Sequence, residues 1–206
     1  MLILIGSPRR DGNSATLAEV VRRGAEAAGT RAQVCFLDDC IGHLLHDTRN
    51  PREGVAEDGY AELFLDRFLP ADGVVFCTPV YWYGMSAQTK AFLDRAFEYY
   101  VAGHPRHEEV LAGMQRKRIG LCVASEESYP GVALGIVHQM QEFARYTHSS
   151  FVGVVHGVGN RRGEVVRDPR NPVAAAEALG REFFARAYSD YRADTPRSTT
   201  VWAAAD

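Results

Sequence analysis

The fold is decided by the first fifteen residues, which read Met1-Leu2-Ile3-Leu4-Ile5-Gly6-Ser7-Pro8-Arg9-Arg10-Asp11-Gly12-Asn13-Ser14-Ala15. Residues 1–5 form a short, continuous apolar run, which is typical of a strand buried on both faces. Residues 7–12 are rich in turn-forming side chains. Asn13 and Ser14 are residue types that cap the start of a helix. The stretch therefore predicts a strand, a polar loop and a helix.

The loop at residues 7–12 is a candidate anion site. A helix that begins just beyond a buried strand directs free N–H groups and the positive end of its dipole at the loop. Arg9 and Arg10 add positive charge there. An ordinary turn between a strand and a helix, capped for stability, accounts for the same residues. This stretch alone leaves both interpretations open.

The composition excludes several classes of protein. A chain of 206 residues is long enough for one sizeable core, and its net charge of −3 lacks the basic excess of a nucleic-acid-binding protein. No apolar run approaches the roughly 20 residues of a membrane span, and the N-terminus does not resemble a signal peptide. We therefore expect a cytoplasmic protein that binds neither nucleic acid nor membrane. Its four cysteines are expected to be free thiols.

Apolar strands and amphipathic helices alternate along the chain. Strands are predicted at residues 1–5, 32–37, 73–78, 119–125 and 151–156. Helices between and after them have predicted core faces at Leu17, Val20, Val21, Gly24 and Ala28; at Tyr60, Leu63, Phe64 and Phe68; at Leu93, Ala96, Phe97 and Tyr100; at Ala133, Val137, Met140, Phe143 or Ala144 and Thr147; and at Val173, Ala176, Leu179, Phe183 and Ala187. This pattern predicts an α/β fold with a five-stranded parallel sheet. The strand order is the flavodoxin-like 2-1-3-4-5, or half of a dinucleotide-binding fold. We expect one domain over residues 1–206, with residues 189–206 as a tail.

Ligands bind beyond the carboxyl ends of the strands in such sheets. The loops at those ends are residues 7–12, 38–57, 79–85, 126–131 and 157–163. The first, third and fourth of these loops are expected to converge.

The first loop lacks the motifs of several phosphate chemistries. It has no Gly-x-Gly-x-x-Gly, no Gly-Lys-Ser/Thr and no cysteine, which disfavours a dinucleotide turn, a nucleoside triphosphatase and a cysteine-based phosphatase. The remaining pattern suits a monophosphate that is held rather than transferred. Ser7, Asn13 and Ser14 are the candidate side-chain donors, and Arg9 or Arg10 would neutralise charge.

The third loop carries three adjacent aromatic residues, Tyr81, Trp82 and Tyr83, directly after a buried strand. Aromatic side chains at that edge of a sheet are suited to lie beside a flat ring system. Packing beneath a helix or in a subunit interface is the alternative explanation.

Three other segments give weaker signals. Cys40, His43 and His46 are spaced as metal ligands, but a closed zinc site needs a fourth ligand, for which only Asp47 is nearby, so we favour a loop that borders the site. Residues 126–131 combine carboxylates with Tyr129, a residue placed to border a ring. Residues 157–163 are predicted to be a turn whose arginines can meet an acidic cofactor.

Two motifs together resemble a known family. They are Gly6-Ser7-Pro8-Arg9-x-x-Gly12-Asn13-Ser14-x-x-Leu17 and Thr78-Pro79-Val80-Tyr81-Trp82-x-x-Met85-Ser86-Ala87-Gln88-x-Lys90-x-Phe92-Leu93-Asp94-Arg95. In this order they are similar to the NAD(P)H-dependent FMN reductases. The resemblance implies a flavodoxin-like three-layer αβα sandwich, bound FMN, and a homodimer or homotetramer. It also implies hydride transfer from NADPH or NADH to FMN and on to a small acceptor such as a quinone or a flavin. A non-enzymatic FMN-binding electron carrier is the alternative.

The resemblance also assigns residues by position. It implies that the phosphate is held by Ser7, Arg9, Asn13, Ser14 and Ala15, and that the ring is bordered by Pro79, Val80, Tyr81 and Trp82, to which we add Ser125 and Tyr129 as further cofactor-binding candidates. No catalytic side chain is expected, because the flavin carries the chemistry. The iron–sulfur members of the family have a compact Cys-x2-Cys-x2-Cys, where this chain has Cys40, His43 and His46. A cluster normally needs four thiolates, so we expect neither a cluster nor another metal.

Overall fold

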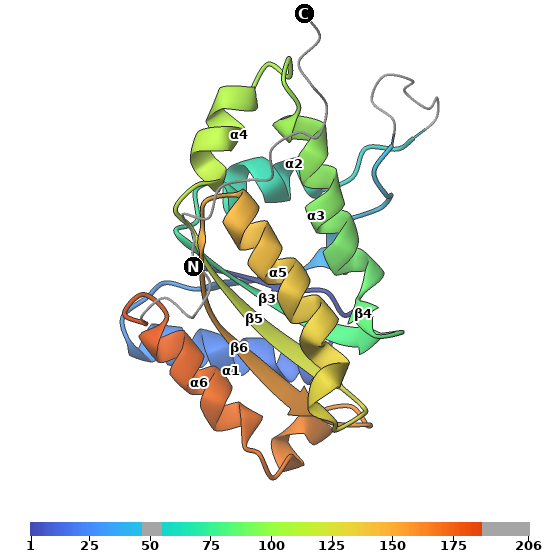
Figure 1. Cartoon of the computed structure of the whole chain (residues 1–206), viewed down its shortest axis with the longest axis vertical. Helices are drawn as coiled ribbons and strands as arrows, with labels where there is room; N and C mark the ends of the chain where they lie inside the picture. The colour runs from blue at the N-terminus through green and yellow to red at the C-terminus, as the bar shows by residue number, and fades with distance from the viewer. Residues whose placement is uncertain (47–54, 187–206) are drawn as a thin grey trace, which may run out of the picture.

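A twisted sheet of parallel strands separates two layers of helices in the computed structural model, which describes residues 1–46 and 55–186 (Figure 1). The expected tail at 189–206, Ala187 and the part of the 38–57 loop that contains Asp47 lie outside the described residues. The strands are β1 (Leu2–Ile5), β2 (Gln33–Phe36), β3 (Gly73–Tyr81), β4 (Gly84–Met85), β5 (Arg118–Ser125) and β6 (Ser150–Val158). Their order is β2-β1-β3-β5-β6, and β4 pairs with β3.

The predicted fold is right in part. The flavodoxin-like α/β class and the parallel sheet are confirmed, but the sheet has a sixth strand, β4, which runs antiparallel to β3. The prediction missed it because β3 continues beyond Thr78 to Tyr81 and then turns back. Trp82 and Tyr83 make the turn with positive φ angles of 48° and 62°. A two-residue hairpin turn of this kind normally contains Asn or Gly, so these aromatic residues did not indicate a hairpin.

The helices cover both faces of the sheet (Figure 1). They are α1 (Asn13–Ala27), α2 (Tyr60–Glu62), α3 (Ala87–Tyr100), α4 (His107–Met114), α5 (Leu134–Tyr146) and α6 (Pro172–Glu182), with short 3₁₀ segments at Leu37–Asp39, Pro130–Ala133 and Glu164–Arg167. Alternate residues of β1 point into different cores: Leu2 and Leu4 pack on the side of α3 and α5, whereas Ile3 and Ile5 pack on the side of α1 and α6. The two-sided burial predicted for the first strand is confirmed.

Two helical predictions need correction. Residues 63–68 form a π-helix that follows the short α2, and Leu69 N–H donates to Phe64 O at 2.9 Å. In α3 the buried face is rotated from the predicted one: Phe97 is 56% exposed and Phe92 is fully buried. The cause is Arg95, which is buried because it pairs with Asp58 and Glu98. A prediction that places only apolar residues in the core therefore misses the buried face of α3.

The predicted faces of α1 and α5 are correct at most of their positions. Ala28 is exposed just beyond the end of α1, where Ala25 is buried instead. In α5 the buried residues are Ile136, Met140 and Ala144. Among the described helices, none combines the length and the apolarity that a membrane crossing requires.

Lys117, which directly precedes β5, binds the backbone that follows the 63–68 helix. Its side chain is buried, and Nζ donates to the carbonyl oxygens of Leu69 and Ala71, each at 2.7 Å. We expect Lys117→Met to lower the free energy of unfolding by about 2 kcal/mol, because one buried and one partly buried carbonyl lose their donor. Lys90→Met, at an exposed pair with Asp94, is the control and should change it by less than about 0.5 kcal/mol.

The pH dependence of this difference provides a second measurement. Burial lowers the pKa of Lys117 from 10.5 to about 8. Between these two values the unfolded chain binds more protons than the folded chain, so the Lys117 contribution to stability rises with pH. Urea unfolding of wild type and Lys117→Met at pH 7.5 and pH 10 should show a larger difference at pH 10. An equal or smaller difference at pH 10 contradicts this assignment.

Candidate functional site

The loops that follow β1, β3, β5 and β6 meet around a cavity of about 220 Å³ at the carboxyl end of the sheet. It is lined by Ser7, Arg9, Gly12, Asn13, Ser14, Pro79, Val80, Tyr81, Ala124, Ser125, Glu126, Gly159, Asn160, Arg161 and Arg162. The first, third and fourth loops converge as expected. The loop after β6 joins them and completes the cavity wall.

The first loop leaves donors free at this cavity. Helix α1 begins at Asn13, and Gly12 rather than Asn13 or Ser14 occupies the N-cap position, without a side-chain cap. The N–H groups of the first helical turn have no partner within the helix. Ser14 is 2% exposed, and its hydroxyl has no hydrogen-bond partner among the residues that the structure describes. A buried polar atom of this kind is uncommon, and here it lies in the cavity wall.

Asn13 makes two contacts that were not predicted. Its Nδ2 donates to Gly159 O at 2.8 Å, and its Oδ1 accepts from Val165 N–H at 3.1 Å. One N–H and the oxygen of the Asn13 amide thus join the first loop to the loop after β6. The amide has a second N–H, and Asn13 lines the cavity, so its role as a phosphate donor stays a prediction. The sequence of the first loop contains no signal for this, because both partners lie about 150 positions away.

The cavity arginines divide into paired and unpaired ones. Arg162 binds Asp11 at 2.7 Å, which lowers the pKa of that carboxyl, and Arg10 outside the cavity pairs with Asp39. Arg9 and Arg161 have no ion pair within the part of the chain that the structure describes. Of the two candidates predicted in the first loop for neutralising charge, Arg9 is thus the available one. Arg161 is the available arginine of the 157–163 turn, whose arginines were expected to meet an acidic cofactor.

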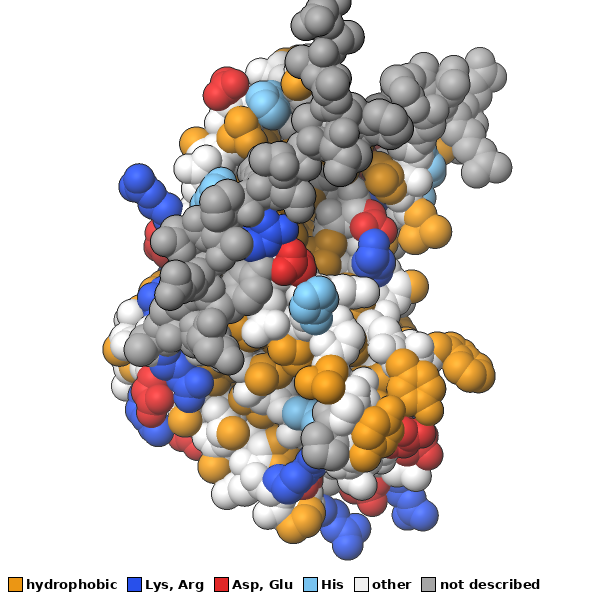
Figure 2. Space-filling view, viewed as in Figure 1, with side chains coloured by type: hydrophobic (Ala, Val, Ile, Leu, Met, Phe, Trp, Pro, Cys, Tyr) orange, Lys and Arg blue, Asp and Glu red, His pale blue; other side chains and the backbone are white. Residues whose placement is uncertain are grey.

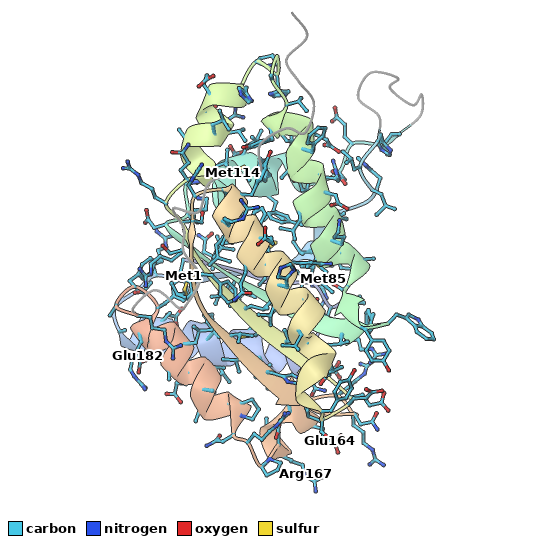
Figure 3. The ribbon with its side chains drawn as sticks, viewed as in Figure 1. Met1, Met85, Met114, Glu164, Arg167 and Glu182 are labelled. Carbon is cyan, nitrogen blue, oxygen red and sulfur yellow. The ribbon has the colours of Figure 1, made fainter. Side chains whose placement is uncertain are left out.

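The backbone of the loop after β6 is fixed near Arg161. The N–H groups of Asn160 and Arg161 both donate to Glu164 at 2.8 Å, which lowers the pKa of that carboxyl. Glu164 and Arg167 lie at this end of the molecule (Figure 3). The turn predicted for residues 157–163 begins after Val158, where β6 ends, and the 3₁₀ segment Glu164–Arg167 follows it. The arginine pair and the position after a strand were the available signals for this loop.

The aromatic loop borders a second cavity beside the first. This second cavity has a volume of about 300 Å³, and it shares Val80, Ser125 and Glu126 with the first. Trp82 and Tyr83 line only the second cavity, and Trp82 is 97% exposed at the tip of the β3–β4 hairpin. Hydrophobic side chains stand out at that edge of the molecule in Figure 2.

The remaining predicted site residues lie as follows. Pro79, Val80, Tyr81 and Ser125 line the first cavity together with Ser7, Arg9 and Ser14. Ala15 is buried in the core under α1, and Tyr129 is 49% exposed; neither lines the two cavities.

A larger cavity of about 910 Å³ lies among α2, α3 and the 43–46 segment. His43 and His46 stack there with ring centroids 4.5 Å apart. Three of its charged groups bind one another: Arg95 pairs with Asp58 and Glu98, and Asp58 also accepts from backbone N–H groups. Among residues 1–46 and 55–186, no three metal-ligating side chains are grouped to hold an ion. The smaller cavity is therefore the better candidate for a charged ligand.

The fold and this loop cluster define a flavodoxin-like protein. The family model of the flavodoxin-like fold matches residues 1–179, and the chain belongs to this family. A curated relative, "Putative NAD(P)H-dependent FMN-containing oxidoreductase YwqN" of Bacillus subtilis (strain 168), is 28% identical over 181 residues, which cover 87% of this chain and 96% of the relative. This match confirms the resemblance to the NAD(P)H-dependent FMN reductases.

Solved structures agree with the fold. The Trp repressor binding protein from Bacillus subtilis is 26% identical, with a TM-score of 0.67 over 86% of this chain and 96% of that chain. An NAD(P)H:quinone oxidoreductase from Methanothermobacter marburgensis has a TM-score of 0.63 at 17% identity, over 88% of this chain and 94% of that chain. The second similarity concerns the fold alone.

Proposed function

We propose that this protein is an FMN-dependent oxidoreductase that takes hydride from NADPH or NADH and passes electrons to a small acceptor, such as a quinone or a free flavin. The observation behind the proposal is the buried hydroxyl of Ser14, which has no partner among the described residues. The same cavity holds Arg9 and Arg161, which form no ion pair within the described part of the chain. The flavin-containing relative supports it independently.

The phosphate end of FMN fits the α1 side of the cavity. A phosphate monoester carries close to two negative charges at pH 7, which Arg9 and Arg161 would balance. Ser14 would donate a hydrogen bond from its hydroxyl to the phosphate. The N–H groups at the start of α1 would complete the set of donors. None of these groups has a partner among residues 1–46 and 55–186, so binding phosphate there displaces no ion pair of the described residues.

The ring end of FMN would extend from the first cavity into the second. The first cavity alone, at about 220 Å³, is smaller than the roughly 300–1,000 Å³ of typical cofactor pockets. Joined to the second cavity through Val80, Ser125 and Glu126, it reaches that range. Tyr81 lines the first part, and Trp82 and Tyr83 line the second. Ring stacking and backbone contacts in this loop would orient the flavin.

When bound, FMN supplies the hydride-transfer chemistry. The side chains of this chain bind and orient it, and none has to act as a nucleophile. The wide exposure of Trp82 and Tyr83 leaves the mouth of the second cavity open to a nicotinamide and then to a small acceptor.

The direct test is reconstitution with FMN followed by anaerobic reduction. The purified protein should bind FMN and show flavin absorption, and NADPH or NADH should bleach it rapidly. Failure to bind added FMN overturns the proposal. Bound FMN that neither nicotinamide cofactor reduces would instead indicate an electron carrier.

Ser14→Ala tests whether the Ser14 hydroxyl contacts the phosphate of FMN. We expect the Kd for FMN to rise about 10-fold or more, because a hydrogen bond to a charged group contributes roughly 1.5–3 kcal/mol. Thr16→Ala is the matched control, since the Thr16 hydroxyl already donates to Gly12 O, and its Kd should change by less than about threefold. Titration of flavin fluorescence measures both. Equal effects of the two variants contradict a direct phosphate contact from Ser14.

A further inference from the structure

Ser125 stands where the two cavities join. It is the last residue of β5, it is 4% exposed, and it lines both cavities. A ligand that extends from the first cavity into the second must therefore pass its side chain. The chemistry of this hydroxyl consequently bears on which ligand atoms can lie there.

The Ser125 hydroxyl has two close partners within the protein. Its Oγ is 2.6 Å from the Glu127 carbonyl oxygen and 2.6 Å from Nε2 of His156. His156 belongs to β6, where it is in register with Val123 of β5. Because side chains two residues apart share a face of a strand, Ser125 and His156 lie on the same side of the sheet.

The proton positions follow from these two contacts. A carbonyl oxygen only accepts, so the single hydroxyl proton of Ser125 goes to Glu127 O. The imidazole nitrogen at 2.6 Å must then be the donor, which means that Nε2 of His156 carries a proton. One lone pair of Ser125 Oγ remains, and it is available to the cavity. Held in this way, Ser125 accepts hydrogen bonds from a ligand and does not donate them.

The charged groups around His156 leave Nε2 as the donor to Ser125. Arg170 and Asp168, from the segment after β6, are the charged groups that act on the imidazole, and burial together with Arg170 lowers its pKa. Arg170 and Asp168 bind each other at 2.7 Å. A neutral imidazole has one N–H, which the contact with Ser125 places on Nε2, and an imidazolium keeps that N–H. The donor to Ser125 is thus the same in both charge states.

We propose that His156 is a positioning residue. Together with the Glu127 carbonyl, it holds the Ser125 hydroxyl so that the remaining lone pair of Oγ accepts from an N–H group of the flavin ring. This inference rests on the proposed function. In oxidised flavin the ring has a single N–H, in its imide group, and that group is the expected partner. His156 touches no ligand atom in this scheme, since its effect passes through the Ser125 hydroxyl.

Ser125→Ala and His156→Leu test the scheme as a double-mutant cycle. Each should raise the Kd for oxidised FMN about 10-fold, and the double variant should lose no more than Ser125→Ala alone, because both changes remove one interaction. His156→Gln, whose side-chain amide can donate, should stay within about threefold of wild type. His138→Gln, at an exposed position on α5, is the control and should have no effect.

The tautomer of His156 gives a readout that does not depend on bound flavin or on activity. Nitrogen-15 NMR of the wild-type imidazole, without FMN, should show the proton on Nε2 at neutral pH. A proton on Nδ1, an unchanged Kd in His156→Leu, or additive losses in the double variant overturns this inference alone. If His156→Leu does not fold, then Ser125→Ala, His156→Gln and the tautomer decide. A wild-type chain that binds no FMN overturns the proposed function and this inference with it.

Discussion

Replacing Arg9 and Arg161 together with alanine is expected to raise the Kd for FMN by about 100-fold or more, while the Kd for riboflavin changes by less than about threefold. Both arginines line the first cavity without an ion pair among the described residues. Each would make a charge-assisted hydrogen bond worth roughly 1.5–3 kcal/mol to the phosphate, and about 2.7 kcal/mol corresponds to a factor of 100. Riboflavin lacks the phosphate, so the comparison isolates that end of the ligand.

The matched control replaces Arg10 and Arg162 with alanine. Arg10 pairs with Asp39 and Arg162 pairs with Asp11, both at exposed positions. Exposed ion pairs contribute about 0–1 kcal/mol, and these charges are already balanced, so FMN binding should fall by less than about fivefold. Fluorescence titration with both flavins measures all four affinities. Equal losses for FMN and riboflavin in the Arg9 and Arg161 variant would show a structural effect, and no loss would place the phosphate elsewhere.

The parts of this site that the sequence predicted are local ones. A buried strand, a polar loop and a helix within fifteen residues were enough to locate the α1 end of the cavity, because these elements are set by neighbouring residues. The same holds for Pro79, Val80 and Tyr81, which follow a buried strand directly. Their convergence with Ser125 follows from the parallel sheet, since carboxyl ends of parallel strands share one edge.

The parts that the sequence did not predict depend on distant contacts. Asn13 is a residue type that often caps a helix, but its amide instead forms hydrogen bonds with Gly159 and Val165. No local sequence pattern predicts a partner so far along the chain. The rotated face of α3 has the same cause, because Arg95 is buried only where Asp58 reaches it from another element.

The second large effect is expected at the contact between α1 and α6, where two glycines face backbone atoms. A Cβ at Gly180 would lie 2.1 Å from the carbonyl oxygen of Val21, and a Cβ at Gly24 would lie 2.2 Å from that of Glu177. Backbone atoms cannot rotate away as a side chain can, so any side chain here must push the helices apart. Because α1 carries the first loop at its N-terminus, its position also sets the phosphate end of the site.

Gly180→Ala is therefore expected to lower the free energy of unfolding by about 3 kcal/mol, near the upper end of typical overpacking costs. The better helix propensity of alanine, worth up to about 1 kcal/mol, offsets only part of the clash. Gly135→Ala in α5 is the matched control: its Cβ would lie 3.7 Å from Tyr83 O, an ordinary contact, so propensity should stabilise it by up to about 1 kcal/mol. Urea unfolding of both variants should thus give changes of opposite sign. A neutral or stabilised Gly180→Ala would mean that α1 and α6 can separate without cost, and the first loop would then lack the rigid support on which the proposed phosphate site depends.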